Sequence, residues 1–223
     1  MQGDSIDRAA RVGCPVCSQA LAHRGACANR WCARNDREFS VAFAVGVHEG
    51  ALRHAVLRYK YRHELWWADV FARLFADHLH GHSTWFEDFD LLVPTPSFLG
   101  PAARRPWDPV GEIAIRLRPL VEPLWELGFG VVSKKWETPP MQGRPVSDRQ
   151  VIAAGPLRRS LHVARPQQVA GARILVLDDV LTVGSTLREV ARVLRRSGAR
   201  EVAGLVLARP VWRDRSRGPA TEP

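Results

Sequence analysis

The stretch "ILVLDDVLTVGSTL", residues 174–187, constrains the fold more than any other part of the sequence. Four apolar residues bounded by Gly171 lead into two adjacent carboxylates, which predicts a short buried strand with acids at its end. From Thr186, apolar residues at helical spacing predict a helix that closes at Gly198, and residues 201–207 predict a returning strand. Strand, helix and strand in this order indicate a right-handed crossover in a doubly wound, mainly parallel α/β sheet.

The rest of the chain supplies further elements for such a sheet. Hydrophobic spacing and turn residues predict strands at residues 39–47, 89–93 and 130–133, and helices at 51–61, 67–80 and 108–118. Pro119 and Pro123 are expected to interrupt the next part, with a second helical piece left open over residues 120–127. Residues 134–149 are basic, contain three prolines and follow no hydrophobic period, so we expect a long functional loop there.

Two carboxylates beside a Thr-Gly-Ser run indicate a binding site at the end of the central strand. Ligands of open parallel sheets bind beyond the carboxyl ends of the strands, where a following helix presents unpaired N–H groups that suit a phosphate. Asp178 and Asp179 would repel that phosphate, but they can accept hydrogen bonds from ribose hydroxyls, directly or through Mg²⁺. The alternative is an accidental strand–turn–helix with solvated acids. The predicted phosphate-binding residues are Thr182, Val183, Gly184, Ser185 and Thr186.

All four cysteines lie near the N-terminus, at Cys14, Cys17, Cys27 and Cys32. The first pair has the C-x2-C spacing that lets two thiolates meet one metal, and four thiolates suit a tetrahedral structural zinc. Such a metal would fold a segment too small to have a core of its own. An iron–sulfur cluster, a redox dithiol and the absence of a metal remain as alternatives.

Composition sets broader limits on function. The net charge of +9 suits an anionic partner, although a generally basic surface accounts for it equally well. The sequence contains no run of eighteen apolar residues and therefore predicts no membrane span. The polar N-terminus lacks a secretion signal, so we expect a cytoplasmic protein. We predict a cysteine module at residues 1–38, a main domain at 39–210 and a disordered tail at 211–223.

The stretch at residues 174–186 resembles the fingerprint of the phosphoribosyltransferase family at every position. The whole chain looks most like the ComF (competence protein F) branch of that family. The matches are the four cysteines, the pair Lys60-Tyr61, the strand end Val93-Pro94-Thr95-Pro96, the segment Thr138-Pro139-Pro140-Met141-Gln142 and the opening stretch. The resemblance implies a type I phosphoribosyltransferase fold carrying a small four-cysteine zinc module.

The resemblance also implies roles for individual residues. Asp178 and Asp179 would hold the ribose hydroxyls of phosphoribosyl pyrophosphate, and residues 182–186 its 5-phosphate. The basic loop would close over the reacting centre, and we take Lys134 and Arg144 from it as catalytic candidates, with Lys135 and Arg149 as further cations. The pyrophosphate would be bound by Pro94, Thr95 and Pro96, with Arg104 or Arg105 supplying charge.

Two functions are therefore expected from the sequence. The first is transfer of ribosyl 5-phosphate from phosphoribosyl pyrophosphate, bound with Mg²⁺, to an unidentified nitrogen acceptor with release of pyrophosphate. The second is binding of single-stranded DNA without catalysis, in line with the competence and DNA-uptake role that the resemblance implies. The two are compatible, and the sequence leaves open whether the chain forms a homodimer.

Overall fold

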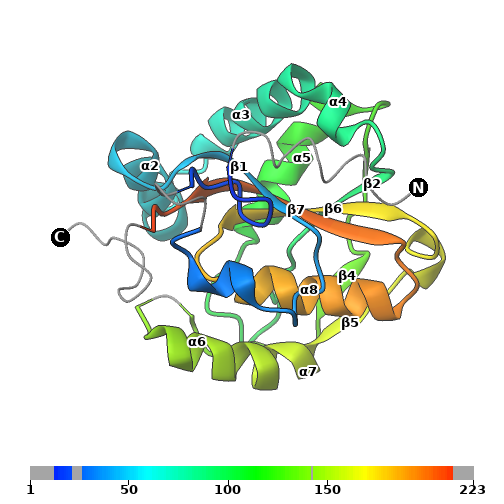
Figure 1. Ribbon diagram of the computed structural model, residues 1–223. Helices are drawn as coiled ribbons and strands as arrows, with labels where there is room; N and C mark the ends of the chain where they lie inside the picture. Colours follow the sequence, from blue (N-terminus) through cyan, green and yellow to red (C-terminus); the bar gives the residue numbers. More distant parts are fainter. Residues whose placement is uncertain (1–12, 22–26, 142, 213–223) are drawn as a thin grey trace.

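The computed structural model describes residues 13–21, 27–141 and 143–212 (Figure 1). The tail predicted from the sequence falls almost wholly outside these residues. Trp212, the last described residue, is buried, and its backbone N–H donates to Gln19 Oε1 at 2.9 Å. None of the helices in the described part of the chain has the length and apolar composition of a membrane span.

A five-stranded parallel sheet forms the centre of the molecule, in the order β1-β7-β6-β2-β3. A separate antiparallel pair, β4 and β5, lies apart from it. The predicted mainly parallel α/β architecture is confirmed. The strands are β1 (Ala42–Val47), β2 (Leu91–Pro94), β3 (Glu126–Leu127), β4 (Val132–Lys134), β5 (Leu161–Val163), β6 (Arg173–Val180) and β7 (Glu201–Arg209).

Helices cover both faces of this sheet (Figure 1). Helices α3, α4 and α5 lie on one face, α6, α7 and α8 lie on the other, and α2 stands at one end. The α-helices are α2 (Gly50–Arg62), α3 (Trp67–Gly81), α4 (Ser83–Phe86), α5 (Pro109–Val121), α6 (Val146–Ile152), α7 (Arg158–Ser160) and α8 (Ser185–Arg196). The short turns η1 (Arg30–Ala33), η2 (Ala153–Leu157) and η3 (Pro166–Gln168) complete the described elements.

The central strands are apolar along their length because both sheet faces are covered. Seven consecutive residues of β7 are buried, and β6 buries the four apolar residues that precede its acids. Helix α8 packs so closely on β7 that a Cβ at Gly204 would lie 2.5 Å from a methyl carbon of Leu187. A larger residue at this position would therefore force Leu187 to move where the helix crosses the sheet. The two cores above and below the sheet position the carboxyl ends of β6 and β7 at one edge.

Two sequence predictions in the middle of the chain are wrong. Helix α5 runs through Pro119 to Val121, because a proline in the last turn removes only one helical hydrogen bond. Residues 120–127 form no second helix; instead Glu126 and Leu127 pair with β2 as the edge strand β3. A two-residue strand is too short to give an alternating pattern in the sequence.

The predicted loop at residues 134–149 is shorter than expected. Lys134 ends strand β4 and Val146 begins helix α6, which leaves residues 135–145 as the irregular segment. Gln142 lies outside the described residues. The sequence analysis assigned no element to residues 150–173, where the structure has the end of α6, η2, α7, β5 and η3. These pieces are short and contain Gly155 and Pro156, so no helical period develops in the sequence.

Candidate functional site

The segment after β6 has the backbone of an anion-binding loop. Gly184 precedes helix α8 with φ 72° and ψ 16°, a left-handed conformation that glycine adopts without strain. Among the described residues, no side chain caps the first N–H groups of α8. These groups, together with the positive end of the helix dipole, therefore remain available to a phosphate. The structure thus brings the predicted residues Thr182, Val183, Gly184, Ser185 and Thr186 into one turn at the helix start.

The two adjacent acids at the end of β6 contact different elements. Asp178 Oδ1 accepts a hydrogen bond from Thr95 Oγ1 at 2.9 Å, across the junction between β6 and β2. Asp179 Oδ2 forms an ion pair with Lys60 Nζ of helix α2. Strand β6 runs to Val180, so both acids are part of the strand rather than beyond its end. One acid is thus tied to the strand end at Thr95, and the other to α2.

These contacts separate the protonation behaviour of the two carboxyls. Burial, and then the neighbouring charge of Asp179, raises the pKa of Asp178 to about 7. Burial also acts to raise the pKa of Asp179, but the Lys60 ammonium outweighs it and holds that pKa below its usual value. The pKa of Lys60 is raised in turn, because the attraction of Asp179 exceeds the cost of burying the ammonium. At neutral pH the site therefore carries one fully ionised carboxylate beside one that is close to its midpoint.

A cavity of about 340 Å³ opens beside these acids. Its walls include the complete turn at residues 181–187, both acids, and one face of helix α2. The α2 residues follow the spacing of a single helix face. They are Arg53, Val56, Leu57, Lys60 and Tyr61. His48, Glu49 and Pro210, which follow the carboxyl ends of β1 and β7, also line the cavity. The volume is in the range of small-molecule sites.

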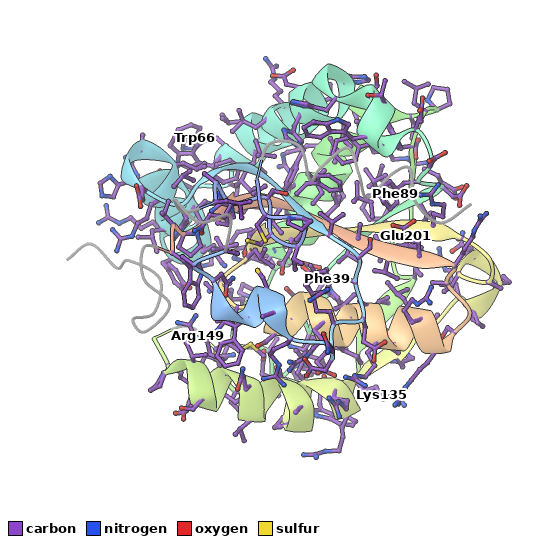
Figure 2. The ribbon with its side chains drawn as sticks, viewed as in Figure 1. Phe39, Trp66, Phe89, Lys135, Arg149 and Glu201 are labelled. Carbon is purple, nitrogen blue, oxygen red and sulfur yellow. The ribbon has the colours of Figure 1, made fainter. Side chains whose placement is uncertain are left out.

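The predicted catalytic cations of the basic loop do not line this cavity. Lys134 Nζ donates to Thr138 Oγ1 at 2.9 Å, and burial lowers the pKa of Lys134. Arg144 is exposed, and its Nε donates to the backbone oxygen of Pro140 at 2.8 Å. Arg149 is the loop cation on the cavity wall, and burial lowers its pKa. Figure 2 places Arg149 on the side of the molecule where α2 lies.

The predicted pyrophosphate-binding residues lie on the β2 side of Asp178. Pro94 and Thr95 are buried, and the Thr95 N–H donates to Leu177 O at 2.9 Å, while Pro96 is half-buried. Arg104 donates to Thr138 O at 3.0 Å and approaches Glu137, so it holds the basic loop. These four residues are outside the cavity wall.

Arg105 acts on Asp179 through its charge. Its guanidinium is 4.9 Å from the ring centroid of Tyr61, and its charge helps to lower the pKa of Asp179. The segment that precedes Gln142 also reaches the site, since Thr186 Oγ1 is 3.7 Å from the Met141 sulfur. The basic loop therefore already contacts the turn at residues 182–186.

The four cysteine sulfurs gather at one point, all within 4.8 Å of one another. Cys17 Sγ and Cys27 Sγ are 3.7 Å apart, close to the separation of about 3.8 Å between sulfurs that each lie about 2.3 Å from one tetrahedral zinc. Cys14 and Cys17 are buried, and Cys27 and Cys32 are half-buried. This donor set fits one metal ion and leaves no thiolate over, so any zinc bound here would be structural.

Comparison with known proteins identifies the family. Residues 109–220, just over half of the chain, match the family described as phosphoribosyl transferase domain. The chain belongs to the phosphoribosyl transferase domain family. The match takes in β6, the two acids and the turn at residues 182–186. The comparison with curated proteins finds no match.

Solved structures of phosphoribosyltransferases are similar to this chain at low identity. A purine phosphoribosyltransferase from Pyrococcus horikoshii is 21% identical over 69% of this chain and 80% of its own, with a TM-score of 0.39. The glutamine phosphoribosylpyrophosphate amidotransferase from B. subtilis is 19% identical over 62% of this chain and 26% of its own, also with a TM-score of 0.39. A hypoxanthine phosphoribosyltransferase from Staphylococcus aureus is 8% identical over 69% of this chain and 71% of its own, at a TM-score of 0.39. These likenesses concern the fold alone.

Several site residues of this phosphoribosyl transferase domain escaped the sequence analysis. From the sequence, Lys60 has no predicted role beyond the pair with Tyr61, Arg53 lies away from the apolar face of the predicted helix, and His48 has no predicted role. A signal was present, because Arg53, Val56 and Lys60 recur at intervals that place them on one helix face. The sequence does not reveal that this face lies against the end of β6.

Proposed function

We propose that this protein binds phosphoribosyl pyrophosphate and transfers its ribosyl 5-phosphate to a nitrogen nucleophile, releasing pyrophosphate. One observation carries the proposal: the turn at residues 182–186 and the acids Asp178 and Asp179 line the same cavity. A phosphate group and a vicinal diol are joined in ribose 5-phosphate, and these two sets of residues match them in chemistry. Membership of the phosphoribosyl transferase domain family supports the same donor.

In this proposal each group acts through position and charge. The N–H groups at the start of α8 hold the 5-phosphate, and Asp178 and Asp179 orient the ribose hydroxyls. Mg²⁺ would be held by the same carboxylates, whose hard oxygen ligands it prefers, and would supply positive charge to the pyrophosphate. Positive charge from Arg105 and Arg149, which lie beside Asp179 and on the cavity wall, would stabilise the departing group.

Direct binding measurements test this function. Calorimetry with phosphoribosyl pyrophosphate and Mg²⁺ should show saturable binding to the wild type, which the double variant Asp178→Asn plus Asp179→Asn abolishes. The control is Asp77→Asn, because Asp77 is an exposed acid of α3 outside the cavity. Equal binding to the wild type and the double variant would contradict the assignment of Asp178 and Asp179 to the donor site.

The acceptor is sought with the donor already bound. We expect pyrophosphate release to accelerate with one class in a panel of nucleobases and amines added to the wild type with donor and Mg²⁺. Binding of single-stranded DNA, the alternative function, remains a prediction, and a salt-dependent filter-binding titration tests it.

A further inference from the structure

We propose that the cysteine module positions the phosphate-binding turn, so that donor affinity depends on the metal state of the cysteines. The connection is the segment of residues 32–39, here called the strap, which runs from Cys32 to Phe39 beside helix α8. The statement about donor affinity rests on the function proposed above. The mechanical coupling of the strap to the turn does not.

One half of the cysteine cluster is fixed to the central sheet. Ala42 of β1 donates its N–H to Val16 O at 2.8 Å, and Ser18 Oγ donates to Ala42 O at 2.9 Å. Gln19 donates from Nε2 to Trp212 O at 2.7 Å, just after β7. The loop that carries Cys14 and Cys17 is therefore held by the strands at the centre of the fold.

The other half of the cluster continues into the strap, which is fixed to α8. Arg37 donates to the Cys32 backbone oxygen at 2.7 Å, which ties the strap to its metal-ligand end. Asp36 forms an ion pair with Arg188 at 3.3 Å, and Glu38 forms one with Arg192 at 3.0 Å. Both arginines belong to α8, whose N-terminal turn carries the proposed phosphate site.

The strap ends directly behind the turn. A Cβ placed on Gly184 would lie 3.4 Å from Cζ of Phe39, so the ring lies within van der Waals reach of a side chain at this position, where the backbone is left-handed. Figure 2 shows Phe39 between the sheet and α8. A small pocket of about 30 Å³ separates the module from the turn, and its walls include Cys17, Cys32, Leu181 and Thr182. Turn and module thus face each other with little space between them.

A metal at the cysteines would join these two anchored halves. With the metal bound, the sheet-held loop and the strap are fixed relative to each other, and the strap holds Gly184 and the start of α8. Without it, the strap is retained by its ion pairs with α8, which are weak individually, and by the packing of Phe39 against the core. The turn would then sample more conformations, and a phosphate ligand would have to order it on binding.

Hydrogen exchange of the turn amides, at residues 181–186, tests the coupling without any donor. The double variant Asp36→Asn plus Glu38→Gln removes the strap's two carboxylates, which pair with α8, while leaving every cysteine in place. We expect it to keep one zinc per chain, to exchange faster at the turn and to bind phosphoribosyl pyrophosphate about fivefold to tenfold more weakly. Asp69→Asn is the matched control, since Asp69 contacts Arg116 at the same 3.3 Å but lies on α3. The conservative variant Asp36→Glu should restore most of the affinity when introduced beside Glu38→Gln.

Removing the metal from the wild type with a chelator gives a second measurement. We expect faster exchange at residues 181–186 with unchanged protection of residues 174–177 in β6. If chelation also speeds exchange of the β6 amides, the domain has unfolded, and the strap variant then decides whether the strap is coupled to the turn. Unchanged turn exchange and unchanged affinity in the zinc-loaded strap variant would overturn the proposal. If the wild type itself binds no donor, the proposed function fails, while the exchange data still decide the coupling.

Discussion

Replacing Lys60 with methionine removes the cation that keeps Asp179 ionised in a largely enclosed site. Methionine has a similar length and fills the same space, so the change is mainly one of charge. The side chains of Lys60 and Asp179 are 19% and 14% exposed. Breaking a fully buried pair costs about 3–5 kcal/mol, and this degree of exposure brings the expected loss at pH 8 to about 2–3 kcal/mol.

The loss should depend on pH in a defined direction. In the wild type the pKa of Asp179 is below its unfolded value, so its contribution to stability is present above pH 4 and is lost as the pH falls through the folded pKa. Without Lys60, the attraction that lowers the pKa of Asp179 is lost, and burial acts to raise that pKa. The variant can then relieve the penalty by protonating Asp179 at low pH, so we expect a loss of only about 1 kcal/mol at pH 5.

Urea unfolding at pH 5 and pH 8 measures both values. Lys135→Met is the control, because Lys135 is exposed and should change stability little at either pH. The same destabilisation at both pH values, or none at pH 8, would refute the conclusion that Lys60 neutralises Asp179.

Three further outcomes are expected. Calorimetry should show the affinity for phosphoribosyl pyrophosphate with Mg²⁺ rising about tenfold from pH 6 to pH 8. Burial raises the pKa of Asp178 to about 7, and this carboxyl must lose its proton to bind the donor with Mg²⁺. An affinity that does not change with pH would contradict this role. Gly184→Val forces a β-branched residue to a φ of 72° against the Phe39 ring, and should cost about 1–3 kcal/mol in thermal unfolding; an unchanged melting temperature would count against the strained turn. Tyr59→Phe leaves the Pro109 carbonyl without its 2.7 Å donor, so urea unfolding should show a loss of about 1–2 kcal/mol, and a neutral result would mean that this carbonyl finds another partner.

The clustering of the cysteines and the turn at residues 182–186 could both be predicted because their residues are close in sequence. Thr182 to Thr186 form one turn whose backbone is set by Gly184 and by the start of α8, so local rules suffice. The cysteines likewise occur within nineteen consecutive positions, from Cys14 to Cys32. The helix α3 was predicted over residues 67–80 and runs over Trp67–Gly81, because its apolar residues repeat at a strict helical interval.

The partners of these local features depend on tertiary structure. Thr95 and Asp178 are 83 residues apart and meet because β2 and β6 are neighbours in the sheet. Arg188 and Asp36 are 152 residues apart and meet because the strap lies along α8. Neither contact leaves a periodic pattern in the sequence. Periodicity reports which face of one helix or strand is buried, and does not report which elements pack against each other.

The sequence by itself therefore determined the chemistry available at the end of β6: two carboxylates, a glycine turn and a helix start, all in one contiguous stretch. Only the tertiary structure decided how that chemistry is tuned. By burying both acids and pairing Lys60 with Asp179, it raises the pKa of Asp178 and lowers the pKa of Asp179. The physical reason is that a carboxyl's charge depends on burial and on nearby cations, and both are set by elements distant in the chain.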